Sequence, residues 1–272
     1  MIPFTKAHAC GNDFLIVTEE AAGNKDWATL TQRLCERNTG VGADGIEFFA
    51  WTGTNAGCIR LHNADGSIAE ISGNGTRCVA AWMARERNLA AGDAVEISTD
   101  AGLRVCRINA LRTEDKFTVD VTTGMGVPEF NKRAVTLSDG SNIEGIEVST
   151  GNPHFVIVAD RPDFTKNGKT WKELGAEICV HPNFPNQTNV EFVHVVGPSE
   201  IEIRIFERGV GPTTSSGTGS SASATAAIAF CGCTSPLIVV APGGPQTVAW
   251  IGDGAELYLT GPAALIARGE AW

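Results

Sequence analysis

The sequence lacks any apolar run that approaches the ~18 residues of a membrane-spanning helix. Its first six residues (MIPFTK) do not form the hydrophobic core that a signal peptide needs. Both absences argue against a membrane or secreted protein and predict a cytoplasmic location. Lysine and arginine form no cluster and the formal net charge is −10, so we expect no nucleic-acid partner and no membrane partner.

Signatures of metal sites and disulfides are also missing. The eight cysteines are scattered along the 272 residues, which is typical of reduced thiols rather than of a disulfide framework. The five histidines show neither helical i, i+4 pairing nor zinc-finger spacing, and the lone C-x-C at Cys231 and Cys233 is weak evidence for a metal. We therefore expect no structural zinc.

One glycine-rich segment matches a nucleotide-binding pattern only by its letters. Residues 40–45 read G-x-G-x-x-G, but they follow a helix-like segment and precede the strand-like residues 46–49. Dinucleotide-binding domains have the opposite order, strand first and helix second. The segment therefore does not predict a nucleotide cofactor.

The sequence does contain an internal repeat. The segment Ser72 to Gly75 (SGNG) returns as Ser216 to Gly219 (SGTG), an offset of 144 residues. Residues 11–17 (GNDFLIV) return as residues 151–158 (GNPHFVIV), an offset of 140. Two copies of a unit of roughly 130 residues explain both offsets. We expect an N-terminal domain of residues 1–124 completed by a C-terminal return at 263–272, and a second domain of residues 125–262.

Strand-like segments outnumber helical ones. Three segments have the pattern of helices, residues 27–37, 75–88 and 218–230, and the last carries so little charge that we expect sheet to enclose it. Many strands around few helices predict an α+β fold of two pseudo-symmetric domains, each a curved, mostly antiparallel sheet or barrel wrapped around a central helix. The strand-like segments are residues 13–17, 46–49, 94–98, 103–108, 116–121, 155–158, 190–196, 201–206, 236–240 and 257–260.

The paired S-G-x-G turns open two of the predicted helices. Glycines let backbone N–H groups approach a ligand, and the positive end of a helix dipole favours an anion such as a carboxylate. Serine is also a preferred N-cap residue, so one such turn alone would indicate only capping. Two matched turns among amide side chains favour a site that addresses one substrate from opposite sides.

Seven short motifs, taken together and in order, resemble the diaminopimelate epimerase family. The match runs essentially end to end and closes with residues 259–263 (LTGPA). The resemblance implies an active site in the cleft between two domains and no metal, flavin or pyridoxal cofactor. It also implies conversion of LL- to meso-diaminopimelate for lysine and cell-wall precursor synthesis, and it leaves a homodimer open. The motifs are residues 8–14 (HACGNDF), 63–67 (NADGS), 73–77 (GNGTR), 151–154 (GNPH), 188–190 (TNV), 207–211 (ERGVG) and 217–219 (GTG).

The resemblance also assigns roles to single residues. Amides and guanidinium groups match carboxylate and ammonium partners, and helix N-termini stabilise the charge that grows as a Cα proton leaves. The residues expected to hold the distal amino-acid end of the substrate are Asn12, Asn63, Asn152, Asn189 and Arg208, with Glu207 beside them. Those expected to grip the reacting α-carboxylate and amine are Gly73, Asn74, Gly217 and Thr218.

The family has cysteines where this chain has Ser72 and Ser216. In the family, one thiolate removes the Cα proton and the opposite thiol delivers a proton to the other face. A thiol titrates near ~8.5 and an alcohol near ~15.7, a gap of ~10 kcal/mol for forming the anion. A helix terminus offsets at most ~2 kcal/mol of that cost. Ser72 alone therefore cannot replace the thiolate base.

Three interpretations of the serines remain open. The chain is an amino-acid epimerase, or a related proton-shift isomerase or dehydratase, whose proton transfer depends on His154 or Glu207. Alternatively, both cysteines have been replaced and Ser72→Cys/Ser216→Cys would restore activity, or the chain only binds an amino acid. We expect a cofactor-independent isomerase of a small amino-acid substrate, with Ser72, Ser216, His154 and Glu207 as candidate catalytic residues.

Overall fold

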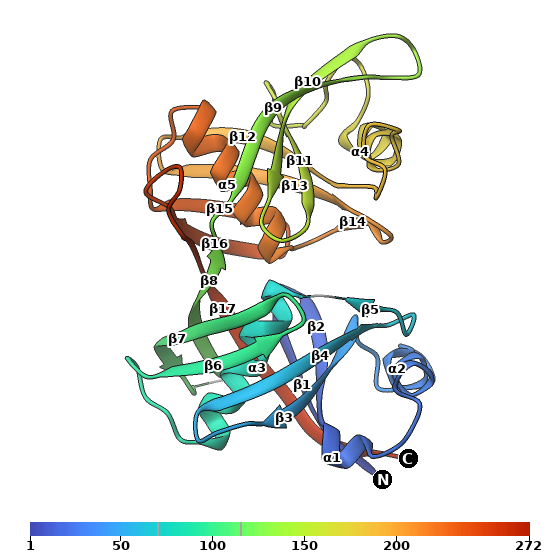
Figure 1. Ribbon diagram of the computed structural model, residues 1–272, viewed down its shortest axis with the longest axis vertical. Helices are drawn as coiled ribbons and strands as arrows, with labels where there is room; N and C mark the ends of the chain where they lie inside the picture. Colours follow the sequence, from blue (N-terminus) through green and yellow to red (C-terminus); the bar gives the residue numbers. More distant parts are fainter. Residues whose placement is uncertain (70, 115) are drawn as a thin grey trace. The chain divides into compact units, whose positions relative to one another are not determined.

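The computed structural model describes residues 1–69, 71–114 and 116–272, and divides the chain into two compact units. The first unit contains residues 1–124 and 260–272, and the second contains residues 125–259. The chain leaves the first unit in strand β8 (Phe117–Gly126) and returns in the long strand β17 (Leu257–Ala271) (Figure 1). The return into the first unit thus begins at residue 260, compared with the residue 263 expected from the sequence.

The first unit is a mixed, mostly antiparallel sheet. Among its described pairings, β2 with β3 and β4 with β6 are parallel, while β1–β2, β3–β4, β4–β5, β6–β7 and β7–β8 are antiparallel. The end of β17 completes the sheet by pairing with β1, from Ile2 opposite Ala271 to His8 opposite Ala264. Its further strands are β1 (Ile2–Ala9), β2 (Asn12–Thr18), β3 (Gly45–Trp51), β4 (Ala56–Asn63), β5 (Ile68–Ala69), β6 (Ala94–Thr99) and β7 (Gly102–Arg112).

The second unit repeats this order of strands. Its parallel steps, β11 with β12 and β13 with β15, fall at the same places as those of the first unit, so β2 corresponds to β11 and β3 to β12. The predicted α+β fold of two pseudo-symmetric halves is confirmed. The strands are β9 (Glu129–Thr136), β10 (Asn142–Ser149), β11 (Pro153–Val158), β12 (Asn189–Gly197), β13 (Glu200–Glu207), β14 (Gly211–Thr213), β15 (Leu237–Ala241) and β16 (Gly244–Ala249).

Each unit contains one central helix. Helix α3 (Gly73–Glu86) packs against β1, β2, β6 and β7, and its Val79 and Met83 side chains are fully buried in that core. Helix α5 (Gly217–Phe230) packs against β10 to β13, β15 and β16, and all of residues 217–227 are buried. The expectation that sheet encloses this nearly uncharged helix is confirmed.

Further helices cover the other face of each sheet. In the first unit, helix α1 (Glu19–Ala22) and helix α2 (Trp27–Cys35) form a separate apolar cluster with that sheet face. In the second unit, helix α4 (Trp171–Cys179) does the same. The sequence analysis missed α4, because Gly175 interrupts a short segment with a residue of low helix propensity. That glycine allows a close approach, since a Cβ on Gly175 would lie 2.6 Å from Phe206 Cβ.

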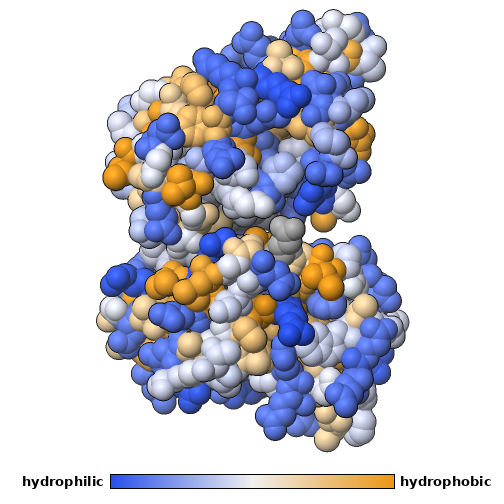
Figure 2. Space-filling model, viewed as in Figure 1, coloured by the Kyte–Doolittle hydropathy of each residue, from blue (hydrophilic) through white to orange (hydrophobic). Residues whose placement is uncertain are grey.

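The face drawn in Figure 2 is largely hydrophilic, and apolar residues gather there only in small separate groups. Within residues 1–69, 71–114 and 116–272, no helix combines the length and apolarity that crossing a bilayer requires. All eight cysteines are free thiols.

Candidate active site

Ser72 is the N-cap of helix α3. Its backbone is extended (φ −124°), and its Oγ accepts a hydrogen bond from the backbone N–H of Gly75 at 3.0 Å. Gly73, Asn74 and Gly75 are buried in the first turn. The glycine at position 75 is required by packing, because a Cβ there would overlap Glu47 Oε1.

Ser216 starts helix α5 in the same way. Its backbone is extended (φ −145°), and its Oγ accepts a hydrogen bond from the Gly219 N–H at 3.1 Å. The Ser216 and Thr218 hydroxyl oxygens lie 3.3 Å apart. A Cβ on Gly219 would lie 2.8 Å from Glu191 Oε1. The two turns are thus built alike, each with a serine cap, a glycine three residues later and a buried glutamate against that glycine.

In the first unit, amide groups connect the α3 turn to the start of β2. Asn74 donates to Asn12 Oδ1 at 3.2 Å, and Asn12 donates in turn to Asp44 Oδ2 at 2.6 Å. The fully buried Arg77 donates to Asn74 Oδ1 at 2.5 Å, and desolvation lowers the pKa of its guanidinium. Asn63 is different, because it is exposed and its amide donates to Ser67 Oγ in the turn after β4.

In the second unit, a series of hydrogen bonds connects the α5 turn to the inside of the sheet. Asn152 donates to Thr218 Oγ1 at 3.4 Å, and its Oδ1 lies 3.0 Å from His154 Nε2. His154 Nδ1 lies 2.8 Å from Glu191 Oε1, and neither of these two side chains is exposed. The structure therefore brings together Ser216, Thr218, Asn152 and His154, and adds Glu191 to them.

The protonation of His154 follows from its neighbours. With the Asn152 amide in this orientation, its Oδ1 can only accept, so His154 Nε2 carries a proton. Burial raises the pKa of Glu191, and the nearby His154 opposes that rise. The hydrogen bond between His154 Nδ1 and Glu191 Oε1 holds one further proton between the two side chains.

The remaining predicted residues lie where β12 begins and β13 ends in the second sheet. Asn189 begins β12 opposite His154 of β11, and its amide donates to the Pro153 carbonyl at 3.0 Å. Asn189 Oδ1 accepts from the Arg208 backbone N–H at 2.9 Å. Arg208 is exposed, and Glu207 is half-buried at the end of β13. This edge collects amide, guanidinium and carboxylate groups beside the Asn152 series.

Sequence reasoning missed the two buried glutamates. Glu47 on β3 and Glu191 on β12 have no exposed surface and are separated by 144 residues, the same offset as the two serines. Burial raises the pKa of Glu47 to about 8. The matching segments at residues 46–48 (IEF) and 190–192 (VEF) are the signal that could have found the pair.

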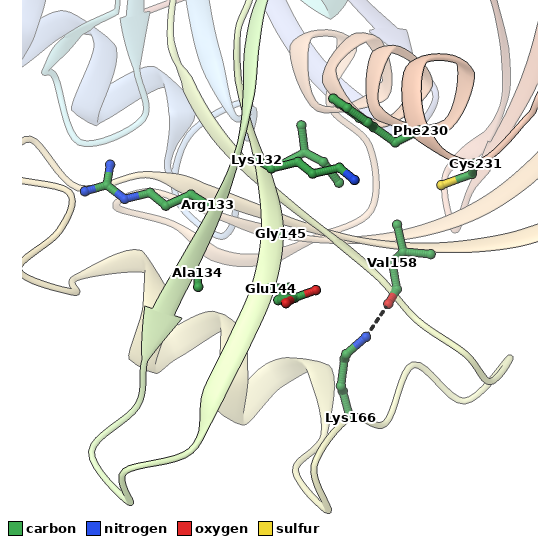
Figure 3. A pocket seen from close by; sticks show the side chains of 10 residues that line it. Lys132, Arg133, Ala134, Glu144, Gly145, Val158, Lys166, Phe230 and Cys231 are labelled. Carbon is green, nitrogen blue, oxygen red and sulfur yellow. Dashed lines mark hydrogen bonds between the residues drawn. The ribbon is translucent and has the colours of Figure 1, made fainter.

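The second unit also has an open hollow of about 600 Å³ that is separate from these residues. Lys132, Lys166, Phe230 and Cys231 are among its lining residues, and Lys166 donates to the Val158 carbonyl (Figure 3). It lies at the C-terminal end of α5, whereas Ser216 is at the N-terminal end. In the part of the chain that the structure describes, no three His, Cys, Asp or Glu residues gather in a way that could hold a metal ion.

Solved structures of other proteins share this architecture. A phenazine biosynthesis protein of the PhzF family from Bacillus anthracis matches with a TM-score of 0.72, 18% identity, and 100% and 99% coverage of this chain and that chain. A probable proline racemase from Agrobacterium radiobacter matches with a TM-score of 0.73, 15% identity, and 100% and 93% coverage. At these identities the likeness shows the fold alone.

Sequence relatives identify the family more specifically than these solved structures do. The diaminopimelate epimerase of Desulforudis audaxviator is 37% identical over 282 residues, covering 98% of each chain. That of Corynebacterium glutamicum strain R is 36% identical over 278 residues, covering 99% of this chain and 98% of the relative. The family model described as diaminopimelate epimerase matches residues 4–130 and 146–266. The resemblance predicted from the motifs is thus confirmed, and the chain belongs to the diaminopimelate epimerase family of isomerases.

Proposed function

We propose that this protein is a cofactor-independent epimerase that moves the Cα proton of an amino acid carrying amino-acid groups at both ends, with diaminopimelate as the substrate. The observation that carries the proposal is the pair of equivalent helix N-termini, each capped by a serine, in a chain of this family. Each N-terminus offers backbone N–H groups and a positive dipole end to a carboxylate. Two of them suit a reaction that must reach both faces of one carbon.

Recognition of the substrate is assigned to the amides and the guanidinium near the two turns. Asn12 is hydrogen-bonded to Asn74 in the α3 turn, and Asn152 is hydrogen-bonded to Thr218 in the α5 turn. Each turn therefore fixes the position of one amide side chain. Asn189 and Arg208 supply groups suited to a distal carboxylate and ammonium. We propose that the two turns act on one substrate.

The proton chemistry needs a stronger base than serine. Glu207 is half-buried at the end of β13 in the same unit as Ser216, and we assign it the role of general base on the Ser216 side of the substrate. His154 is 2% exposed and is hydrogen-bonded to Asn152, so we assign it to fixing the Asn152 amide rather than to direct contact with the substrate. A carboxylate within reach of the substrate has a usable pKa for general base work.

A second candidate function is amino-acid binding without turnover. The observation that favours it is the occupation of both acid–base positions by alcohols, which are about seven pKa units weaker than thiols. A proton-shift isomerase acting on another amino acid would use the same two turns.

Incubation with LL- or meso-diaminopimelate in heavy water separates these functions. A working epimerase incorporates deuterium at Cα and interconverts the two isomers, whereas a binding protein shows heat-shift stabilisation without exchange. Lysine is the matched control ligand because it lacks the second carboxylate, and it should stabilise the protein less. If no diamino acid gives either stabilisation or exchange, the substrate assignment is wrong.

A further inference from the structure

We propose that Glu47 is the proton acceptor and donor behind Ser72, so that the serine hydroxyl relays a proton between the substrate Cα and the Glu47 carboxyl. The proposal rests on the proposed function, because it explains how an alcohol can work where the family has a thiol. In this scheme Glu47 does not touch the substrate and acts through Ser72.

The first argument is that Glu47 is buried without a partner. It has no exposed surface, and neither carboxyl oxygen has a hydrogen-bond partner in the described chain. Buried polar groups in native proteins are nearly always hydrogen-bonded, because an unsatisfied one costs on the order of 1–3 kcal/mol. A purely structural role would be served better by an apolar side chain at this position.

The second argument is where the carboxyl lies. Glu47 is on β3 between Ile16 of β2 and Leu61 of β4, and its Oε1 is directed at Gly75 in the first turn of α3. Ser72 Cβ lies 3.2 Å from the point that a Gly75 Cβ would occupy, which is the point that Glu47 Oε1 overlaps. Because residue 75 has no side chain, the serine and the carboxyl border the same small space.

The third argument is that the second unit repeats the arrangement with one change. Glu191 Oε1 and Ser216 Oγ lie 2.8 Å and 3.2 Å from the corresponding Gly219 point. There, however, His154 is hydrogen-bonded to the carboxyl. Phe14 stands at the position of the first unit that corresponds to His154, so Glu47 can gain or lose a proton without breaking a side-chain hydrogen bond.

The surroundings of Glu47 suit this role. Helix α3 packs on this face of β3 and presents the buried Cys78 thiol, whose raised pKa reflects burial and the nearby Glu47. Arg77, next to Cys78, donates to Gly73 O and Asn74 Oδ1. The apolar surroundings raise the pKa of Glu47 to about 8, close to the range in which a general acid or base is most effective.

The relay balances without a free alkoxide. In one direction, the Ser72 hydroxyl, which makes no hydrogen bond to Glu47 in this structure, turns toward that carboxylate. The Cα–H bond breaks and its proton moves to Ser72 Oγ, while the Ser72 O–H proton moves to the Glu47 carboxylate. The electron pair stays on Cα, where the helix N-terminus stabilises the charge. Glu47 becomes neutral, and the reverse transfer returns the proton. The cost of ~10 kcal/mol for a free serine alkoxide is thereby avoided.

The first test is Glu47→Gln, which keeps the side-chain volume and resembles the protonated acid. We expect Cα exchange with diaminopimelate to slow by about 10²-fold or more, and the pH–rate profile to lose its limb near pH 8, with heat-shift stabilisation by the ligand retained. The matched control is Glu96→Gln, an exposed glutamate on β6 of the same unit, which should leave both the rate and the profile unchanged.

Repeating the substitution in a Ser72→Cys variant distinguishes loss of the relay from general damage to the fold. In Ser72→Cys the thiolate itself can serve as the base, so adding Glu47→Gln should cost no more than a few-fold in rate. An equally large loss in both backgrounds would mean that Glu47 only supports the structure, and would overturn the relay.

A direct measurement on the wild-type protein needs no variant. Carbon NMR of protein labelled at the glutamate side-chain carboxyl should show a resonance that titrates near pH 8 and is assigned to Glu47. A Glu47 resonance that titrates in the ordinary range would overturn the proposal. Exchange that survives Glu47→Gln with an unchanged pH profile overturns the relay alone, whereas a wild-type protein without any exchange overturns the proposed function as well.

Discussion

At the scale of the residue, the two serines cap their helices in addition to any chemical role. Each satisfies a backbone N–H of its helix, at 3.0 Å for Ser72 and 3.1 Å for Ser216. A cysteine caps a helix less well than a serine but is a far stronger acid. These positions therefore favour the stability of the helix ends over acidity.

Ser72→Cys/Ser216→Cys should increase Cα exchange by between 10² and 10⁴-fold, because general acid–base catalysis contributes in that range and the thiols titrate near working pH. Deuterium incorporation into diaminopimelate measures the effect. Ser199→Cys, an exposed serine between β12 and β13, is the control for an added thiol. A double cysteine variant no faster than the wild type would show that the serines do not limit the rate.

Glu47 should make the stability of the fold depend on pH. The carboxyl has a pKa of about 8 in the folded protein and ~4.3 when unfolded, so the folded state holds one more proton between these values. The free energy of unfolding therefore falls as pH rises from about 4 to about 8. Glu47→Gln should remove this loss and be more stable than the wild type at pH 9, by ~3–5 kcal/mol.

Denaturant titrations at pH 5 and pH 9 provide the measurement. The two proteins should be similar at pH 5 and diverge at pH 9. Parallel pH dependences would mean that Glu47 is ionised in the fold and has a partner.

At the scale of the element, long and strongly patterned segments were predictable and short ones were not. The helices at residues 27–35, 73–86 and 217–230 were expected with ends shifted by two residues at most. Helix α4 and the β9–β10 hairpin were missed, because their nine- and eight-residue segments carry few apolar residues in a clear period. Strands β1, β4, β14 and β16 were missed as well, and only residues 257–260 of β17 were expected. The capping box of α4, Thr170 with Glu173, was the readable signal.

Thr170→Ala should lower the free energy of unfolding by ~1 kcal/mol, since it removes the acceptor of the Glu173 N–H and one donor to the Glu173 carboxylate. Cα exchange should stay unchanged. Ser72→Ala removes an equivalent cap on α3 and should lose a similar amount of stability, but it should also slow exchange, because the hydroxyl of the proposed relay is lost. Thermal unfolding with the exchange assay compares the two; equal effects on exchange would contradict a chemical role for Ser72.

At the scale of the whole molecule, the repeat made the architecture predictable. Similar offsets of 144 and 140 residues between glycine-rich segments indicated two similar units, and the parallel steps of the two sheets repeat as such a duplication requires. The buried carboxyl groups of Glu47 and Glu191 were harder to predict. Glu47 occupies a strand position that an apolar residue would normally fill, and only tertiary packing against Gly75 gives it a role.

Removal of residues 264–272 should destabilise the first unit selectively, because it deletes the part of β17 that pairs with β1. Hydrogen-exchange mass spectrometry should show lost protection in β1 and β2, while β12 and β13 keep theirs. Unchanged protection of β1 would mean that the pairing with β17 contributes little.

The closing of the first sheet by β17 has a consequence for biosynthesis. Residues 125–259 form one uninterrupted stretch, so the second unit is complete as soon as that stretch has left the ribosome. The first unit emerges earlier, and its strand β1 can pair with β2 at once, but the other edge of β1 stays unpaired until β17 has been made. An exposed strand edge can pair with another molecule. A chain released before β17 has been made would therefore be prone to aggregate through β1.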